Sequence, residues 1–508
     1  MLLKNKIINI KSYYTIKKVF NNMTLKKKLE LIKYNKVIQK RLNIGINNYK
    51  EYLAIEIEIE INPIKNTKFI NISKKEKKYY RIYFNGEENE IKRNYLSNED
   101  KISKINIKID YEVKSLHGLF YNCDCIKSIS FKKFNGKNII NMSNMFGLCK
   151  SLKQINLLNF NSINVTDMSG MFNGCSSLKE LNLSAFNTTN VRNMNSMFYD
   201  CSSLKELNLS NFNTINVTDM NRMFYGCATL TQINLVSFDT NNVTDMNSMF
   251  YECSSLKELD LSNFNTEKVI NMNRMFYKCL SLHELNLDNF NTTNLTNMER
   301  MFYGCCGLKK LNISSFNTNN VINMNSMFYE CSKLNKLNLS NFITDKVIDM
   351  ESMFNECSSL NELNLSSFNT INVRNMNAMF YGCSSLKKLN LSSFNTINVT
   401  DMNSMFYRCS ALEQINLANF NTTNVTNMKK MFFFCFSLVE LNLSYFITNK
   451  VLIMERMFAG CSSLKELNLS NFNTDNVADM NSMFFECSNE LIMKIKNQYN
   501  IFDEEAFA

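Results

Sequence analysis

Cysteine is the residue type with the widest chemical reach in this chain, which contains 17 Cys among 508 residues. Its thiolate can bind zinc, form disulfides or act as a nucleophile. Fifteen of the 17 recur every 26 residues from Cys123 to Cys487, and only Cys125 and Cys306 lie outside this column. One Cys per repeat does not bring four ligands to a zinc ion, and an odd column cannot pair uniformly into disulfides. We therefore interpret the column, with Cys253 as its example, as a buried structural ladder of free thiols.

The other groups that support catalysis are sparse. Of the two His, His283 falls in a column that other repeats mostly fill with Lys, Asn or Glu, and His117 stands apart. The 12 Gly form no Gly-rich phosphate loop, and neither a GxSxG nor an HExxH motif occurs. Acidic residues such as Glu258 and Glu466 belong to one repeated column, which we expect to be solvated. We predict a protein that is not an enzyme, with no cofactor, no metal and no small-molecule substrate.

The positive charge of the chain is confined to one segment. Residues 1–118 contain 26 Lys/Arg and 13 Asp/Glu, whereas the remainder contains 31 and 33, so the total of +11 comes from the first segment. A Lys-rich solvated surface explains this better than phosphate binding, so we expect no nucleic-acid partner. No run of 18 apolar residues occurs, which predicts no membrane span. The basic start lacks the apolar core of a signal peptide, and we expect a cytoplasmic location.

The elements that would position these residues are set by the 26-residue repeat. One Phe column runs from Phe120 to Phe484, and a second runs from Phe134 to Phe472. Together these columns use 29 of the 39 Phe, and two Met columns use 28 of the 31 Met. Such constancy indicates a stack of similar units in which each buries its apolar face against the next. We predict an α/β repeat solenoid, similar to a leucine-rich-repeat stack, of about 15 coils.

Each unit combines two periodicities, as in the stretch MNSMFYECSSLKELDLSNFNTEKVIN at 246–271. Apolar residues at steps of three and four predict a short helix, with Thr244 and Asp245 as caps. Its members are Val243, Met246, Met249, Phe250, Cys253 and Leu256. An LxxLxL pattern, Leu256 to Leu261, then predicts a short strand that Phe264 closes. We expect Phe250, Phe264, Met246 and Met249 to form core ladders.

The repeat resembles a known family. The stretch MFYGCSSLKKLNLSSFNTINVTDMNSMF is similar to the 26-residue repeat of BspA-like leucine-rich-repeat proteins, over about 119–487. This resemblance implies a surface protein that acts in adhesion and protein binding. The chain departs from ordinary leucine-rich repeats because Phe stands where their turn Asn is expected.

The segments on either side of the repeat differ from it. Residues 1–50 form a basic segment with helical spacing, and 14–44 are faintly similar to an F-box, although the leading Leu-Pro of that module is absent. Residues 51–118 are rich in strand patterns, which we place at 54–61, 78–84 and 104–113. We expect these two segments to form an α+β N-terminal cap whose small sheet covers the first coil, with residues 488–508 as the C-terminal cap.

The outward strand position is Asn in nearly every coil, as at Asn208, and Asp260 is an exception. This column predicts either a flat polar binding face or an amide ladder that hydrogen bonds along the stack, and uniformity favours the ladder.

Departures from the repeat carry more information about function. The coil at 431–446, MFFFCFSLVELNLSYF, places apolar residues where most other coils are polar or small: Phe434, Phe436, Val439 and Tyr445. Leu452 and Ile453 follow, and we expect all of these side chains to be exposed. Contiguous exposed aromatic residues mark partner sites. We predict a non-enzymatic, protein-binding solenoid scaffold whose partner is an unidentified protein. The alternatives are a cell-surface adhesin of the BspA-like type and a ubiquitin-ligase substrate adaptor with F-box-like helices.

Overall fold

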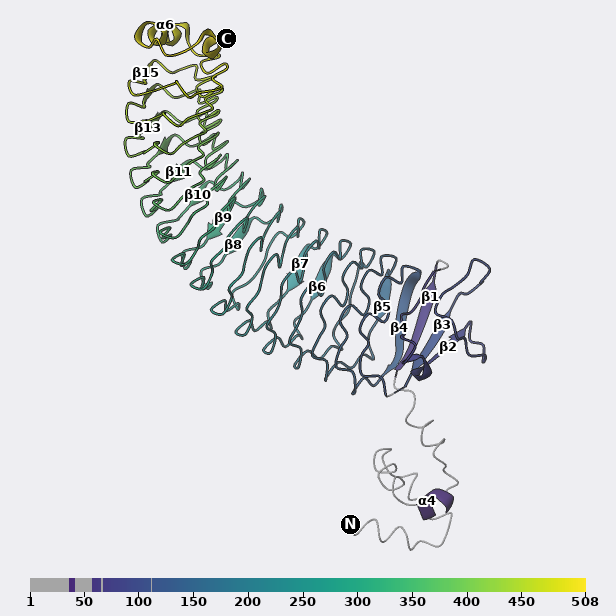
Figure 1. Cartoon of the computed structure of the whole chain (residues 1–508). Coiled ribbons are helices and arrows are strands. Elements are labelled where there is room, and N and C mark those ends of the chain that lie inside the picture. The colour runs from purple at the N-terminus through teal and green to yellow at the C-terminus, as the bar shows by residue number, and fades with distance from the viewer. Residues whose placement is uncertain (1–35, 42–56, 65–66, 111) are drawn as a thin grey trace.

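A computed structural model describes residues 36–41, 57–64, 67–110 and 112–508. From residue 112 onward the chain winds into a β-solenoid of more than a dozen coils, stacked into a curved arc (Figure 1). A small sheet lies at one end of this arc and a helix at the other. The fold is therefore elongated, and each coil contacts mainly its two neighbours.

The N-terminal sheet is continuous with the first coils. Its five strands run in the order β2-β3-β1-β4-β5. Their bounds are β1 Ile57–Pro63, β2 Tyr80–Phe84, β3 Ile105–Ile109, β4 Ile126–Phe134 and β5 Gln154–Asn156. A short 3-10 helix, η1 (Lys77–Tyr79), precedes β2. Strand β1 pairs antiparallel with β3 and β4, whereas β4 pairs parallel with β5. The predicted strands are confirmed where the structure describes them, and the sheet covers the open edge of the first coil.

The coils carry very short parallel strands whose starting residues are 26 or 52 residues apart. These are β6 Glu206–Asn208, β7 Gln232–Asn234, β8 Glu284–Asn286, β9 Lys310–Asn312, β10 Lys336–Leu337, β11 Glu362–Leu363, β12 Lys388–Leu389, β13 Gln414–Ile415, β14 Glu440–Asn442 and β15 Glu466–Asn468. Equivalent residues pair, as Leu207 does with Ile233. Isolated parallel bridges form a second ladder, for example between Asp219 and Asp245. Identical spacing in every coil keeps both ladders in register.

The predicted short helix in each coil is wrong, because residues 246–253 form two consecutive tight turns. The N–H of Met249 donates to the carbonyl of Met246, and that of Cys253 donates to Phe250. Between these bonds, Phe250 donates its N–H to a carbonyl of the next coil, as Met246, Ser248 and Glu252 also do. A helix would use its N–H groups internally, so it could not supply this inter-coil ladder. Asp245 likewise does not cap a helix, since its carboxylate accepts the N–H of Asn247 and closes a turn.

Positive backbone φ angles make the double turn possible. The residue two positions before the column Phe and the residue two positions after it have φ between 51° and 74° in every coil, as at Ser248 (53°) and Glu252 (54°). Left-handed residues reverse the chain sharply, which places apolar side chains three and four positions apart on the same inner side. The spacing that predicted a helix thus has a different geometric origin.

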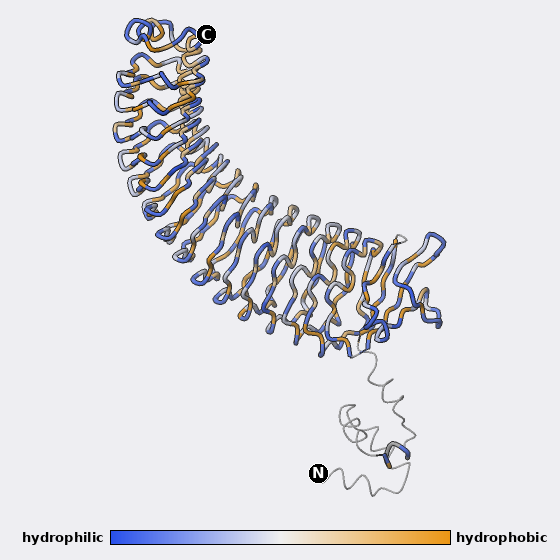
Figure 2. The backbone as a smooth tube through the Cα atoms, viewed as in Figure 1, coloured by the Kyte–Doolittle hydropathy of each residue, from blue (hydrophilic) through white to orange (hydrophobic). Residues whose placement is uncertain are grey.

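The interior consists of the residue columns that the sequence indicates. Phe250, Phe264, Met246 and Met249 are all buried. Phe250 stacks on the ring of Phe276 at 5.9 Å between centroids, and Phe264 stacks on Phe238 at 6.3 Å. Figure 2 shows hydrophobic residues recurring at corresponding positions from coil to coil. Parallel rings one coil apart bury their faces against each other along the whole stack.

A column of buried hydroxyl groups also joins the coils, and sequence reasoning missed it. The Thr292 hydroxyl donates to the carbonyl of Asn317 at 2.8 Å and accepts the N–H of the same residue at 2.8 Å. Thr292 is fully buried, and its equivalents in neighbouring coils are buried as well. Because each hydroxyl satisfies two backbone groups of the next coil, the polar column stabilises the stack instead of weakening it.

The C-terminal residues cover the last coil. Helix α6 (Asn489–Gln498) is capped at its N-terminus by Ser488, whose side chain accepts the N–H of Leu491. A 3-10 helix, η2 (Glu504–Phe507), then supplies the carbonyls that a further coil would provide: Phe484 donates its N–H to Ala506. Of the F-box-like region at 14–44, only α4 (Lys36–Arg41) belongs to the described residues, and the rest of that prediction lies outside them.

Candidate partner-binding surface

The double turns line up along one side of the solenoid, which we call the turn edge. Its most regular feature is a ladder of half-buried Tyr side chains, one position after the column Phe. Rings from Tyr199 to Tyr329 stack in succession, with neighbouring centroids 4.2 to 4.6 Å apart. The ladder resumes with Tyr381 and Tyr407, 4.3 Å apart, and continues to Phe433. Burial raises the pKa of Tyr381 to about 12, so this phenol stays neutral at physiological pH.

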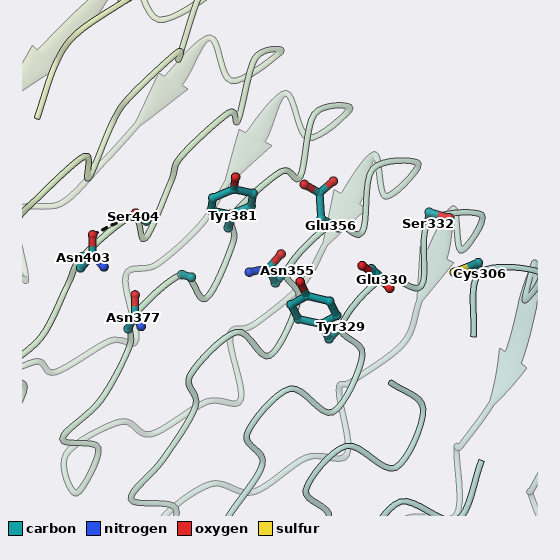
Figure 3. A pocket seen from close by; sticks show the side chains of 11 residues that line it. Cys306, Tyr329, Glu330, Ser332, Asn355, Glu356, Asn377, Tyr381, Asn403 and Ser404 are labelled. Atoms are coloured by element: carbon teal, nitrogen blue, oxygen red, sulfur yellow. Dashed lines mark hydrogen bonds between the residues drawn. The ribbon is translucent and has the colours of Figure 1, made fainter. Parts of the chain in front are cut away.

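The Tyr ladder is interrupted at one coil. Asn355 occupies the ladder position between Tyr329 and Tyr381, and the two rings flank a cavity of about 600 Å³ (Figure 3). Glu330 and Glu356 also line this cavity. Burial raises the pKa of Glu356, an effect that Arg408 partly offsets and that the charge of Glu330 reinforces. We call this cavity the Asn355 notch.

The predicted aromatic site lies farther along the same edge. The rings of Phe434 and Phe436 are 5.2 Å apart between centroids, and both line a groove of about 330 Å³. Phe436 is 44% exposed. The groove also contains Glu356 and Arg408, whose guanidinium carbon lies 6.0 Å from the Phe434 ring centroid. We call Phe434 and Phe436 the aromatic patch. It offers stacking surface beside one carboxylate and one cation.

Phe434 is half-buried, and the expectation that it is fully exposed is wrong. It stands in a left-handed turn position with φ 59°. Its ring leans over Gly460 of the next coil so closely that a Cβ at residue 460 would clash with it. The ring centroid of Phe433 lies 4.0 Å away. Packing against both residues accounts for its partial burial, and the residue still lines the groove.

The other predicted patch residues do not line the groove of the aromatic patch. Tyr445 is 55% exposed and lines a broad groove over the strands from β12 to β15 instead. Val439 is exposed just before β14, where its carbonyl accepts the N–H of Lys465. Leu452 is exposed, whereas Ile453 is half-buried because it takes part in the isolated-bridge ladder. The structure therefore brings Phe434 and Phe436 together and assigns Tyr445 to a different groove.

The Cys column is buried, and all 17 Cys are free. The thiol of Cys253 donates to the carbonyl of Phe224 in the preceding coil, with 3.2 Å between Sγ and O. Burial raises the pKa of Cys175 to about 12 and that of Cys253 well above 9.0, which keeps these thiols protonated. A buried neutral thiol is a poor nucleophile, so the column has a structural role.

The strand Asn column does not form the predicted amide ladder. Asn208 accepts the N–H of Ser210 at 3.0 Å, and Asn182 accepts that of Ser184 in the same way. Each side chain thus closes a turn in its own coil, since Asn favours bonding to the backbone two residues on. Side chains that bridge coils come from another column: Asn216 Nδ2 donates to the carbonyl of Thr189.

The part of the chain that the structure describes contains neither a candidate metal site nor a candidate membrane-spanning helix. No group of three or more His, Cys, Asp or Glu there is arranged to hold a metal ion. His117 Nδ1 lies 2.6 Å from the Ser143 hydroxyl. Among the described residues, no helix has the length and apolar character that crossing a membrane requires.

The inter-coil ladders place the chain in the class of repeat β-solenoids. A family model described as "Mycoplasma protein of unknown function, DUF285" matches residues 114–233, 201–310, 229–335, 280–388, 306–415 and 383–498. Because these matches together span the repeat region and more than half of the sequence, the chain belongs to this family. No curated protein matches the chain.

Two solved structures show partial similarity. A leucine-rich repeat protein from Bacteroides ovatus is 18% identical, with a TM-score of 0.41 over 87% of this chain and 98% of that one. A leucine-rich repeat protein from T. pallidum is 17% identical, with a TM-score of 0.21 over 41% of this chain and 83% of that one. These superpositions are limited, so the fold assignment rests on the hydrogen-bond ladders of the chain itself.

Proposed function

We propose that this protein is a non-enzymatic solenoid scaffold that binds a protein partner through the aromatic patch on its turn edge. The observation that carries the proposal is the pair Phe434 and Phe436, whose rings line a solvent-open groove. They occupy two columns that most other coils fill with small, polar or charged residues, and neither column has another aromatic residue. Partly exposed aromatic rings beside a polar rim are the usual anchors of protein–protein contacts.

The backbone at Phe434 supports this assignment. A bulky side chain at φ 59° is strained by about 1–2 kcal/mol, while Gly occupies the same position without strain at Gly226, Gly304, Gly382 and Gly460. The stack therefore folds without an aromatic ring at this position. Because residues such as Glu252 and Arg408 hold the same conformation, the strain is common to the column, and its aromatic ring is what sets position 434 apart.

A reversion to the repeat consensus tests the proposal. The double variant Phe434→Gly with Phe436→Ser restores residues that other coils use, so its coils should stack normally. The matched control replaces two exposed apolar residues outside the patch, Leu158→Ser with Val236→Ser. We expect a partner retained by the wild-type chain in affinity capture to be lost from the reverted variant and kept by the control. Equal recovery with both variants, at unchanged circular dichroism, would contradict the proposal.

A cell-surface adhesin is the second candidate, and the similarity of the repeat to BspA-like proteins favours it. Labelling of intact cells with a membrane-impermeant reagent distinguishes the scaffold from the adhesin. A scaffold in the cytoplasm stays unlabelled until the cells are lysed, whereas an adhesin is labelled at once. Adaptor function in a ubiquitin ligase requires that residues 1–50 recruit a ligase subunit, which co-purification of the full chain would reveal.

A further inference from the structure

The Asn355 notch has the shape of a slot for one planar group. Neighbouring rings in the ladder are 4.3 Å apart both at Tyr303–Tyr329 and at Tyr381–Tyr407. Tyr329 and Tyr381 are two coils apart, and the residue between them is the smaller Asn355. The space that a Tyr ring fills in the neighbouring coils is therefore open between two aromatic faces (Figure 3).

One polar group in the lining of this slot is a buried acceptor that lacks a donor. Asn355 is only 7% exposed, yet its Oδ1 has no hydrogen-bond partner among the described residues. Its Nδ2 makes only a long contact, 3.5 Å, with the Ser352 hydroxyl. A buried acceptor without a partner is costly, so it indicates a missing donor.

Two carboxylates give the slot a negative charge. Glu330 and Glu356 line it, no Lys or Arg does, and neither carboxylate forms an ion pair with a described residue. Arg408 partly balances the charge of Glu356, and it belongs to the groove of the aromatic patch. A neutral ring inserted here would leave both carboxylates unpaired, while a cation with several donors would satisfy them.

We infer that the Asn355 notch binds a guanidinium group, presented by an arginine side chain of a protein partner. A guanidinium is planar, stacks on aromatic faces and carries five N–H donors, which suit Asn355 Oδ1 and the two carboxylates. A lysine ammonium has the charge but cannot fill a flat slot. The inference does not depend on the aromatic patch, because Glu356 is the only residue that lines both.

Calorimetric titration of the full chain tests this site. The probes are arginine capped at both ends, the equivalent capped lysine and capped tyrosine, at equal ionic strength. We expect capped arginine to bind at least about tenfold more tightly than either alternative. Binding of capped lysine or capped tyrosine with equal affinity would overturn the assignment.

Three variants locate the binding and guard against a folding artefact. Asn355→Tyr restores the consensus ladder and fills the slot, so it should abolish arginine binding. Asn355→Leu keeps the slot open but removes the acceptor, and should weaken binding about tenfold or more. The matched control, Asn173→Tyr, adds a ring at the same repeat position in a coil without two flanking Tyr, and should leave binding unchanged. Unaltered arginine binding by both Asn355 variants would overturn the proposal.

Free arginine as a further probe separates two sources of the guanidinium. Its carboxylate would lie close to Glu330 and Glu356, so we expect it to bind more weakly than capped arginine. Weaker binding of free arginine supports a side chain within a protein segment. Stronger binding of the free amino acid would overturn the assignment to a protein partner.

Discussion

The substitution Thr292→Val tests the inter-coil hydroxyl ladder with little change of shape. Val matches the branched outline of Thr but lacks the hydroxyl, so the N–H and the carbonyl of Asn317 both lose their 2.8 Å partner. Leaving a buried backbone group unpaired costs about 1–3 kcal/mol, which for two groups gives about 2–6 kcal/mol. Because coil contacts are local, the loss should concentrate at the interface between these two coils.

Urea unfolding followed by circular dichroism measures the overall loss, and amide hydrogen exchange at Asn317 measures it locally. A loss of about 2 kcal/mol corresponds to roughly 30-fold faster exchange of the Asn317 amide. Thr293→Val is the matched control, because Thr293 is the adjacent residue and is exposed. Its hydrogen bonds to Asn291 and Asn320 come from its backbone, which the substitution keeps. If Thr292→Val and Thr293→Val differ by less than about 0.5 kcal/mol, the hydroxyl column does not join the coils as argued.

Three further predictions follow from the turn edge and the core. Phe434→Gly alone should raise the free energy of unfolding by about 1 kcal/mol in urea titration, because it relieves the backbone at φ 59°; a destabilised variant would show that ring packing outweighs strain. All 17 thiols should react with a thiol reagent in denaturant, but few should react in the native protein, and a count well below 17 would reveal disulfides. Stability should fall as pH rises above 9.0, because a thiol in the unfolded chain then loses its proton while native Cys175 keeps it up to about pH 12. The free energy of unfolding should fall by about 1.4 kcal/mol per pH unit for each such thiol. A flat alkaline profile would contradict the burial of the column.

The stacking of the coils could be predicted from the sequence because residues that stack on one another in the core occupy the same position in successive repeats. Phe250 recurs at Phe276, and a ring that must stack on an identical ring admits little variation. The strands of the N-terminal sheet were predictable for a similar reason, since Ile57, Ile59 and Ile61 alternate with Glu and are all buried. Strong periodicity reports which side of the chain is buried.

The local backbone was not predictable in the same way. Apolar steps of three and four fit a helix as well as two left-handed turns, and the turn residues that decide between them include Ser248 and Glu252, which carry no signal for a positive φ. The role of Asn208 was missed because a uniform column suits both a ladder along the stack and a turn within each coil.

The Asn355 notch had a signal that could have been found. Nine of the 21 Tyr lie in one repeat column, and Asn355 interrupts the run between Tyr329 and Tyr381. A search for missing members of a column, in addition to unusual ones, would have found the gap. Its chemistry still required the structure, because the unpartnered Oδ1 and the two carboxylates come together only when the coils stack.

Site-specific crosslinking from the aromatic patch tests the central claim most directly. The photoreactive residue p-benzoylphenylalanine replaces Phe436, which keeps an aromatic ring in the groove, and in a second variant it replaces Val236, which is exposed outside the patch. After irradiation in cells, the account predicts a defined crosslinked protein adduct from position 436 and none from position 236. Equal adducts from both positions, or an adduct from position 236 alone, would contradict the claim that this protein binds its partner where the repeat is broken.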